Sequence, residues 1–289
     1  MMIVGDKIKA AAVMACVVAI MSGAGLAWPA RALTPGGELA SHRAIYELAL
    51  AHSHGNSSTS TVAARGRILY DFAGSACEGY KLDFRQVSEL DNGEGRVTLS
   101  DLRSNTWEDG DANNYQFKSQ NYTNNRLVNS VDGQAVRQPD RIAVTLSKPK
   151  DATLGLDRTI VFPTEHVRRI IDAARAGKTI LQFPVYDGSE SGQKVYNTLT
   201  VMGRVIEPEE RVPTDAAAGQ RALAGLKRWP VTVSYFDRSA ATGEQTPVYA
   251  ISFELYENGI SRALLLDYND FAISGELTSL EVRDSKPCP

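Results

Sequence analysis

The chain has 289 residues, with 31 Lys and Arg against 34 Asp and Glu, a formal net charge of −3 and a pI near 5.9. This balance argues against a nucleic-acid partner, which would require a basic face. Beyond residue 32 no stretch is apolar enough to cross a bilayer as a helix, and 33–289 is the right length for one large β domain.

The N-terminus has the three zones of a secretion signal. Lys7 and Lys9 give a positive start, residues 10–26 are almost wholly apolar, and Ala30-Arg31-Ala32 is a small-residue cleavage pattern. These zones predict a signal peptide over residues 1–32 that is removed on export from the cytoplasm.

Three alternatives to this cleavage remain open. Cleavage after Ala27 is a second option for the same signal. A membrane anchor is less favoured, because the apolar run is at the lower limit for spanning a bilayer. A lipid-bearing Cys16 is also less favoured, because the apolar run continues past this residue, whereas a lipid-attachment cysteine lies at its end.

The opening strands of the mature chain show period-two alternation. Within residues 41–50, His42, Ala44, Tyr46 and Leu48 fall on one face, which predicts a half-buried strand. The same pattern predicts strands over 61–72, 80–90, 96–107, 115–120, 126–130, 134–137 and 141–146. Asp132-Gly133 is expected to form a tight hairpin between two of these strands.

One amphipathic helix is predicted in the middle of the chain, from Thr164 to Ala176. Thr164 is the expected N-cap, Ile170 and Ile171 lie on the apolar stripe, and Gly177 stands where a C-terminal cap belongs. A second short helix is expected within residues 216–226, in a charged connection that follows residue 206.

The last third of the chain is predicted to be a meander of strands. Asn258-Gly259 is a strong hairpin signal between two of them. The strands of this half are expected over 179–186, 194–205, 229–237, 247–256, 260–268 and 271–283. With so little helix, the chain is predicted to be mostly β, a large antiparallel sheet curled into a barrel or sandwich.

Cys77 and Cys288 are the cysteines of the mature chain. In an exported protein two thiols most simply pair, and a loop this long gives a chain-entropy stabilisation of about 5 kcal/mol. We therefore predict a disulfide that ties the C-terminus to the first third of the fold. The alternative is a reactive thiol at Cys77, but no Cys-x-x-Cys spacing supports it.

Three short motifs resemble chemical sites, and each lacks a residue that its site requires. His52-Ser53-His54 offers two imidazoles but lacks further metal ligands nearby, so a solvated loop is expected. Asp109-Gly110-Asp111 begins like a calcium loop but has Asn114 and Gln120 at the positions that require Gly and Glu, so an acidic turn is expected.

The third motif is Gly188-Ser189-Glu190-Ser191-Gly192. It has Glu190 where a hydrolase nucleophile elbow has serine, and it is expected to be a flexible hairpin tip. No catalytic residue, metal site or cofactor is predicted for the chain, and an enzymatic role is not expected.

The opening strand, His42-Arg43-Ala44-Ile45-Tyr46-Glu47-Leu48, and the Cys77…Cys288 pair at this chain length resemble the EipB (envelope integrity protein B) family of alphaproteobacterial periplasmic proteins. The resemblance covers essentially the whole mature chain. It implies a periplasmic, open β-barrel-like spiral of antiparallel strands, an internal disulfide and a role in cell-envelope integrity. The family's shape is similar to that of the lipoprotein carriers of the Lol pathway, which is a fold-level analogy for lipid binding.

Four residues are singled out as candidate ligand or partner contacts. His42 and Arg43 belong to the family-like strand, and Trp107 and Trp229 are aromatics on alternating strand positions. The plainer interpretation is that the polar pair ties the first strand to its neighbours and that the aromatics pack in the core.

The leading functional hypothesis is a non-enzymatic periplasmic protein that binds a lipid, a lipoprotein or an envelope protein on a curved sheet. A structural scaffold without a small ligand is the alternative. An envelope hydrolase is less favoured, because no nucleophile or acid–base pair is evident in the sequence.

Overall fold

The computed structural model describes residues 38–53, 61–217, 219–238 and 246–284. In this part of the chain lie α1 (Pro163–Arg175) and a short 3-10 helix, η1 (Arg221–Leu223). The strands are β1 (His42–Ser53), β2 (Ala63–Ser75), β3 (Gly79–Asp91), β4 (Val97–Glu108), β5 (Asn114–Thr123), β6 (Arg126–Arg137), β7 (Ile142–Lys148), β8 (Ala152–Leu156), β9 (Ile180–Val185), β10 (Tyr196–Met202), β11 (Arg228–Asp237), β12 (Tyr249–Tyr256), β13 (Ser261–Asp267) and β14 (Phe271–Val282).

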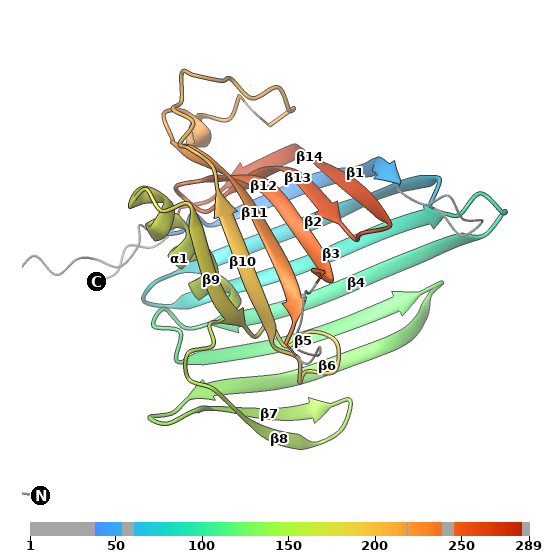
Figure 1. The fold of residues 1–289 in the computed structure, drawn as a ribbon, viewed down its shortest axis with the longest axis vertical. Coiled ribbons are helices and arrows are strands. Elements are labelled where there is room, and N and C mark those ends of the chain that lie inside the picture. The colour runs from blue at the N-terminus through green and yellow to red at the C-terminus, as the bar shows by residue number, and fades with distance from the viewer. Residues whose placement is uncertain (1–37, 54–60, 218, 239–245, 285–289) are drawn as a thin grey trace, which may run out of the picture. The chain divides into compact units, whose positions relative to one another are not determined.

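All of these strands belong to a single 14-stranded sheet that is not closed (Figure 1). The order is β8-β7-β6-β5-β4-β3-β2-β1-β14-β13-β12-β11-β10-β9, and the neighbouring strands are antiparallel. Each half of the chain is a meander, and β1 joins the halves by pairing with β14, with His42 opposite Val282. The predicted fold class is confirmed: mostly β, with one large, open antiparallel sheet.

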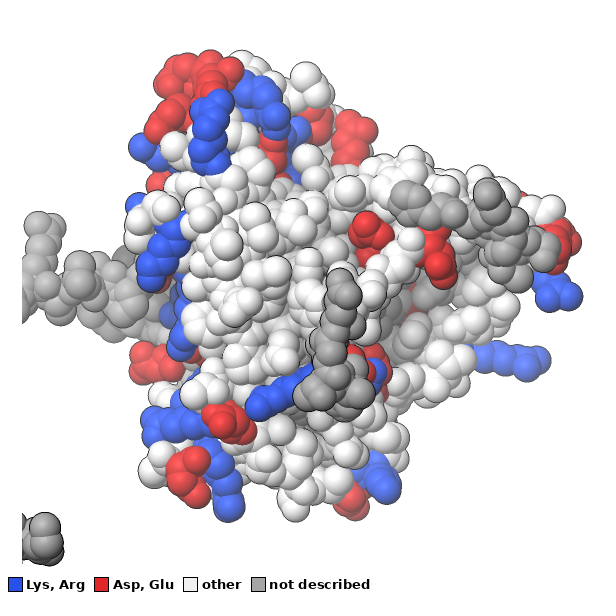
Figure 2. Space-filling model, viewed as in Figure 1, with Lys and Arg blue, Asp and Glu red and all other residues white. Residues whose placement is uncertain are grey.

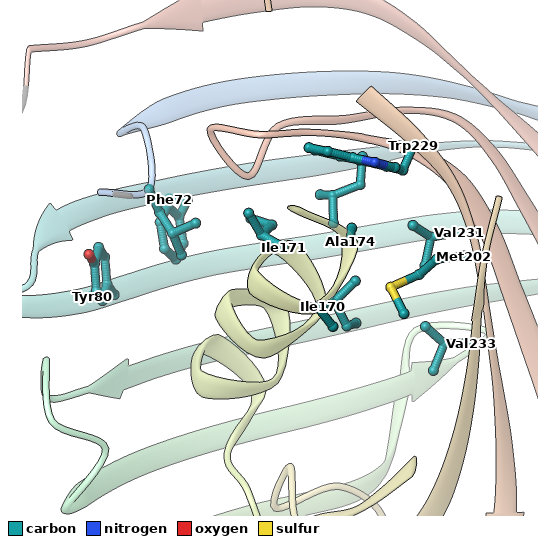
Figure 3. Close-up of a cluster of buried hydrophobic side chains, with 12 residues drawn as sticks. Phe72, Tyr80, Ile170, Ile171, Ala174, Met202, Trp229, Val231 and Val233 are labelled. Atoms are coloured by element: carbon teal, nitrogen blue, oxygen red, sulfur yellow. The ribbon is translucent and has the colours of Figure 1, made fainter. Parts of the chain in front are cut away.

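The sheet curls around α1. Ile170 and Ile171 lie in one buried cluster with Phe72 and Tyr80 from the first half of the sheet and Val231 from the second half (Figure 3). The predicted apolar stripe of α1 therefore packs against strands from both halves of the sheet, which are far apart in the strand order. The helix covers the inward face of the sheet and fills the space between its two halves.

The N-terminus of α1 is capped differently from the prediction. The N-cap is Phe162, not Thr164, because Pro163 can occupy the first helical turn without losing a hydrogen bond. The Glu108 carboxylate at the end of β4 accepts the backbone N–H groups of Thr164 and Glu165, both at 2.7 Å. At the other end, Gly177 follows the helix with a φ of 71°, as predicted for a C-terminal cap.

The predicted hairpin at Asp132-Gly133 is wrong, because β6 runs through both residues as one strand. The turn lies earlier, at Asn124-Asn125, whose φ angles are 50° and 63°. Asparagine tolerates this left-handed conformation and favours two-residue hairpins. At Gly133 the neighbouring strand β7 comes too close for a side chain, since a Cβ there would lie 2.7 Å from the Thr145 carbonyl oxygen.

The predicted second helix is reduced to the single turn η1. The connection around it is held by buried hydrophobic side chains, Ala217 and Leu223, and by buried charged groups. Arg262 bonds Asp215 of this connection, and Glu254 accepts from Arg262 Nη1 at 2.5 Å and from Arg228 Nε at 2.8 Å. These four side chains are all buried, which the sequence did not indicate.

Two rejected motifs lie in loops, as expected. Asp109 closes the turn between β4 and β5 by accepting the Asn113 backbone N–H at 2.6 Å. Residues 188–192 lie in the β9–β10 loop, which packs inward, since a Cβ on Gly188 would lie 2.3 Å from the Phe117 ring.

Several predictions fall outside the described residues. They are the signal peptide with its cleavage site, Cys16, His54 and Cys288. Cys77 lies in the turn between β2 and β3, and its pairing with Cys288 stays a prediction. Among the described helices, none is both long and apolar enough to span a membrane.

Candidate functional site

The outward face of β2–β4 is a charged surface. Opposite charges on neighbouring strands pair, as in Arg65–Glu89 at 2.6 Å. Arg85 and Arg103 both donate to Asp101 and lower the pKa of this carboxyl to about 2. Exposed pairs of this kind contribute only about 0–1 kcal/mol each, so we interpret this face as a solvated surface.

The β10–β11 connection covers part of the outward face of β9–β12, and the part that it leaves exposed is uncharged. Ile180 stands opposite Val201, and these side chains are 61% and 46% exposed. Figure 2 shows a broad area without charges over these strands, with charged side chains at its margins. We call this surface the uncharged face; its rows are Ile180, Val201, Thr232 and Ser252, then Gln182, Leu199, Ser234 and Ala250, then Pro184, Asn197 and Phe236.

The uncharged face ends at the edge strand β9. Val161, which precedes α1, covers one end of this edge by donating to the Pro184 carbonyl oxygen at 2.9 Å. Backbone groups two residues apart along a strand point the same way, so those of Ile180 and Gln182 also point away from β10. No described residue is hydrogen-bonded to them, which leaves a short stretch of open edge.

A groove of about 460 Å³ crosses the outward face of β3–β7. The strand register aligns Trp107, Gln116, Gln134 and Thr145 in one row along it, each directly opposite the next. A second row, two residues further along the strands, places Lys118 opposite Asp132 and Asn105. A β-bulge between Asp132 and Gly133 lies in the lining of the groove.

Comparison with known proteins matches this architecture to a family. The EipB-like family model matches residues 34–284. The cell envelope integrity protein EipB of Brucella abortus is 37% identical over 279 residues, which cover 96% of this chain and 95% of that protein. This chain belongs to the EipB-like family.

A solved structure from the same organism agrees with the fold of this EipB-like chain. It is the crystal structure of the beta-barrel-like protein of the domain of unknown function DUF1849 from Brucella abortus. The TM-score is 0.77 at 36% identity, and the match covers 85% of this chain and 99% of that chain. The resemblance to the EipB family is therefore confirmed.

The predicted contact residues of this EipB-like protein do not form one site. Trp229 is buried in the cluster around α1, and Arg43 is exposed on the outward face of β1. Trp107 lies in the outward groove, and His42 lines an inward pocket of about 80 Å³. His42 and Arg43 are separated in this way because successive side chains of a strand point to opposite faces of the sheet.

His42 is held within the core. Its Nδ1–H donates to the Ala40 carbonyl oxygen at 2.7 Å, and its ring stacks on Tyr70 with 5.5 Å between the ring centroids. Burial lowers the pKa of His42, so the imidazole is neutral at neutral pH. The ring stacking joins β1 to β2, whereas the hydrogen bond to Ala40 lies within the segment that leads into β1.

The inward side is packed by side chains from both halves of the sheet. Besides the cluster around α1, a second cluster includes Tyr46, Leu277 and Ile273, and a third includes Tyr115 and Val144. The described residues contain no group of three His, Cys, Asp or Glu side chains placed to hold a metal ion. The inward pocket at His42 has room for a few waters at most.

The groove and the uncharged face were both missed from the sequence. Gln116 and Gln134 become neighbours only because β5 and β6 turn at Asn124-Asn125. Asn124-Asn125, between the strands predicted over 115–120 and 126–130, is the sequence signal for this turn. The uncharged face also had a signal in the sequence, since the outward positions of the three consecutive strands predicted over 179–186, 194–205 and 229–237 lack charges.

Proposed function

We propose that this protein helps to keep the cell envelope intact by binding an envelope protein at the uncharged face and the open edge of β9. The relative from Brucella abortus is named for cell envelope integrity, which supports the same role here. The observation that carries the binding surface is the contrast between the charged outward side of β2–β4 and the uncharged side of β9–β12.

The chemistry of the partner follows from this surface. Among the described residues nothing pairs with the outer backbone groups of Ile180 and Gln182, which favours an extended segment that adds to the sheet as a further strand. Ile180 and Val201 are exposed apolar side chains at the same edge, and the rows of the uncharged face, all described, hold no charged side chain that would select an acidic or basic partner. The segment is therefore extended, uncharged and partly apolar.

The packed inward side favours this surface over a lipid carried inside the sheet. The pocket at His42 has about 80 Å³, whereas pockets for drug-sized ligands have roughly 300–1,000 Å³. Helix α1 and the three buried clusters occupy the inward face on which a carrier would hold an acyl chain. A bound lipid or lipoprotein would be detected by the experiment described below.

The same proposal places the mature chain, residues 33–289, in the periplasm with Cys77 and Cys288 paired. The signal peptide pattern and the two cysteines support this location. Protein from intact cells is alkylated under denaturing conditions without a reductant and then analysed by mass spectrometry. We expect neither cysteine of the mature chain to be alkylated, and free thiols to appear only after reduction. Alkylation at Cys77 without a reductant would contradict the pairing.

Photocrosslinking in living cells tests the binding surface. A photoreactive amino acid replaces Gln182 on the edge, or Arg67 on the charged face as the matched control. We expect a discrete protein adduct from position 182 that is lost when Val201→Glu places a charge on the uncharged face. Equal adducts from both positions would refute the surface, and lipid retained in native mass spectrometry would favour the carrier instead.

A second readout links the surface to the envelope. In a strain that lacks the protein, wild type should restore resistance to detergent, and Val201→Glu should fail to do so although it is exported and folded. Full resistance with Val201→Glu would show that the envelope role does not depend on the uncharged face. Val97→Glu, at an exposed position of β4 away from the uncharged face, is the control for an added negative charge.

A further inference from the structure

The groove on β3–β7 is long enough for an extended ligand. Its first row, Trp107 to Thr145, crosses three strand spacings, which is about 14 Å at about 4.8 Å per strand. Its volume of about 460 Å³ falls within the usual range of ligand sites. A ligand lying along this row would run across the strands rather than parallel to them.

The polar side chains of this row are available for a ligand. The side chains of Gln116, Gln134 and Thr145 make no hydrogen bond to any described residue, although they face a common hollow. Each glutamine amide has two donors and an acceptor, and the threonine hydroxyl both donates and accepts. The row therefore suits a ligand whose own groups both donate and accept hydrogen bonds.

Trp107 gives one end of the row a fixed aromatic surface. Its Nε1–H donates to the Glu78 carbonyl oxygen at 3.3 Å. The indole also lies so close to Gly79 that a Cβ there would be 2.8 Å from ring atoms Cε2 and Cζ2. The ring is thus positioned by the turn between β2 and β3, and it remains only partly buried.

The charges of the groove balance. Lys118 stands opposite Asp132, and Lys81 pairs with Asp83 at 2.6 Å. The groove therefore selects neither an anion nor a cation. It is also open to solvent, and amide and hydroxyl groups lie in its lining beside the Trp107 ring.

From these observations we propose that the groove binds an unbranched, uncharged oligosaccharide. The apolar face of a sugar ring packs on the Trp107 indole, and the hydroxyls of the following units bond to Gln116, Gln134 and Thr145. This site lies on strands that take no part in the uncharged face, so it does not depend on the function proposed above.

Tryptophan fluorescence and calorimetry test the site in the mature chain, residues 33–289. Its tryptophans are Trp107 and the buried Trp229, so a ligand in the groove changes the emission of Trp107. The probes are tetramers of N-acetylglucosamine and of glucose, with an uncharged tetrapeptide of glycine and serine as the competing class. We expect binding of at least one sugar and none of the peptide.

Variants locate the binding. Gln134→Ala should weaken the affinity about tenfold by calorimetry, which is the factor for one hydrogen bond, without lowering the melting temperature. Asn197→Ala, an exposed amide on the uncharged face, should leave the affinity unchanged. Trp107→Phe, which keeps a smaller ring, should bind more weakly than wild type.

Three results would overturn the proposal. They are binding of the peptide alone, sugar binding that Gln134→Ala does not weaken, and no response to either sugar up to its solubility limit. Each result leaves the crosslinking test of the uncharged face unaffected, so the two ideas fail separately.

Discussion

Glu108 is the buried carboxylate on which α1 begins, and replacing it with glutamine tests how the helix is held in the sheet. The side chain is 1% exposed and accepts two helical N–H groups at 2.7 Å each. Burial raises its pKa from 4.5 to about 7, although the two hydrogen bonds and Arg168 oppose the shift.

The raised pKa sets the direction of the pH effect. Between pH 4.5 and about 7 the folded protein keeps a proton on Glu108 that the unfolded chain has released. The free energy of unfolding therefore falls as the pH rises through this window. At about 1.4 kcal/mol per pKa unit, Glu108 removes about 3 kcal/mol of stability between these limits.

Urea unfolding of wild type and Glu108→Gln at about pH 4.5 and about pH 8 measures this effect. Glutamine stays neutral, so the variant should lack the pH-dependent loss. It has one acceptor oxygen where the carboxyl group has two, so one N–H group of α1 loses its acceptor at both pH values. We therefore expect the difference in stability between variant and wild type to shift by about 3 kcal/mol in favour of the variant from the lower to the higher pH. Glu209→Gln, in an exposed part of the β10–β11 connection, is the control and should follow wild type.

A constant difference between wild type and Glu108→Gln at both pH values would refute this reasoning. It would mean that the N–H groups of α1 hold Glu108 ionised and outweigh its burial.

Three further substitutions test the packing, each measured by urea unfolding. Gly133→Ala should destabilise by about 1–3 kcal/mol, because its Cβ would meet Thr145, Leu146 and Phe117. Gly219→Ala, with open space around it, is the control and should stay near wild type. Equal effects of the two substitutions would contradict the close approach at Gly133. Ile170→Ala should cost about 2–5 kcal/mol through the cavity left beneath α1, and a loss below about 1 kcal/mol would show that the helix is not part of the core. Arg262→Met should cost about 3–5 kcal/mol because it leaves Asp215 and Glu254 short of a buried cation, and the double variant with Asp215→Asn should recover part of that loss.

The sequence predicted the local features of this fold well. Alternation along β1 separated buried His42 and Tyr46 from exposed Arg43, because successive strand residues face opposite sides of a sheet. Helical spacing located Ile170 and Ile171 on the stripe of α1, and Gly177 marked its end. These patterns depend on neighbouring residues only, so they can be read without the fold.

The cap of α1 and the turn after β5 depended on distant contacts or on competing signals. Thr164 looked like an N-cap, but the acceptor for the helix is Glu108, 56 residues earlier in the chain than Thr164. Asp132-Gly133 looked like a hairpin, but Phe117 and Leu146 close around Gly133 in the assembled sheet. A local rule cannot weigh a contact that forms only when the strands pair.

The candidate sites were decided by the tertiary structure alone. The residues by themselves determined a mostly β chain with one helix, because alternation and helical spacing are local properties; the signal pattern, also local, predicts export. Pairing across the sheet decided that Gln116 meets Gln134, that Ile180 meets Val201, and that Arg228 and Arg262 are buried. Which side chains become neighbours on a sheet depends on strand order and register, which are set by contacts between residues far apart in the chain.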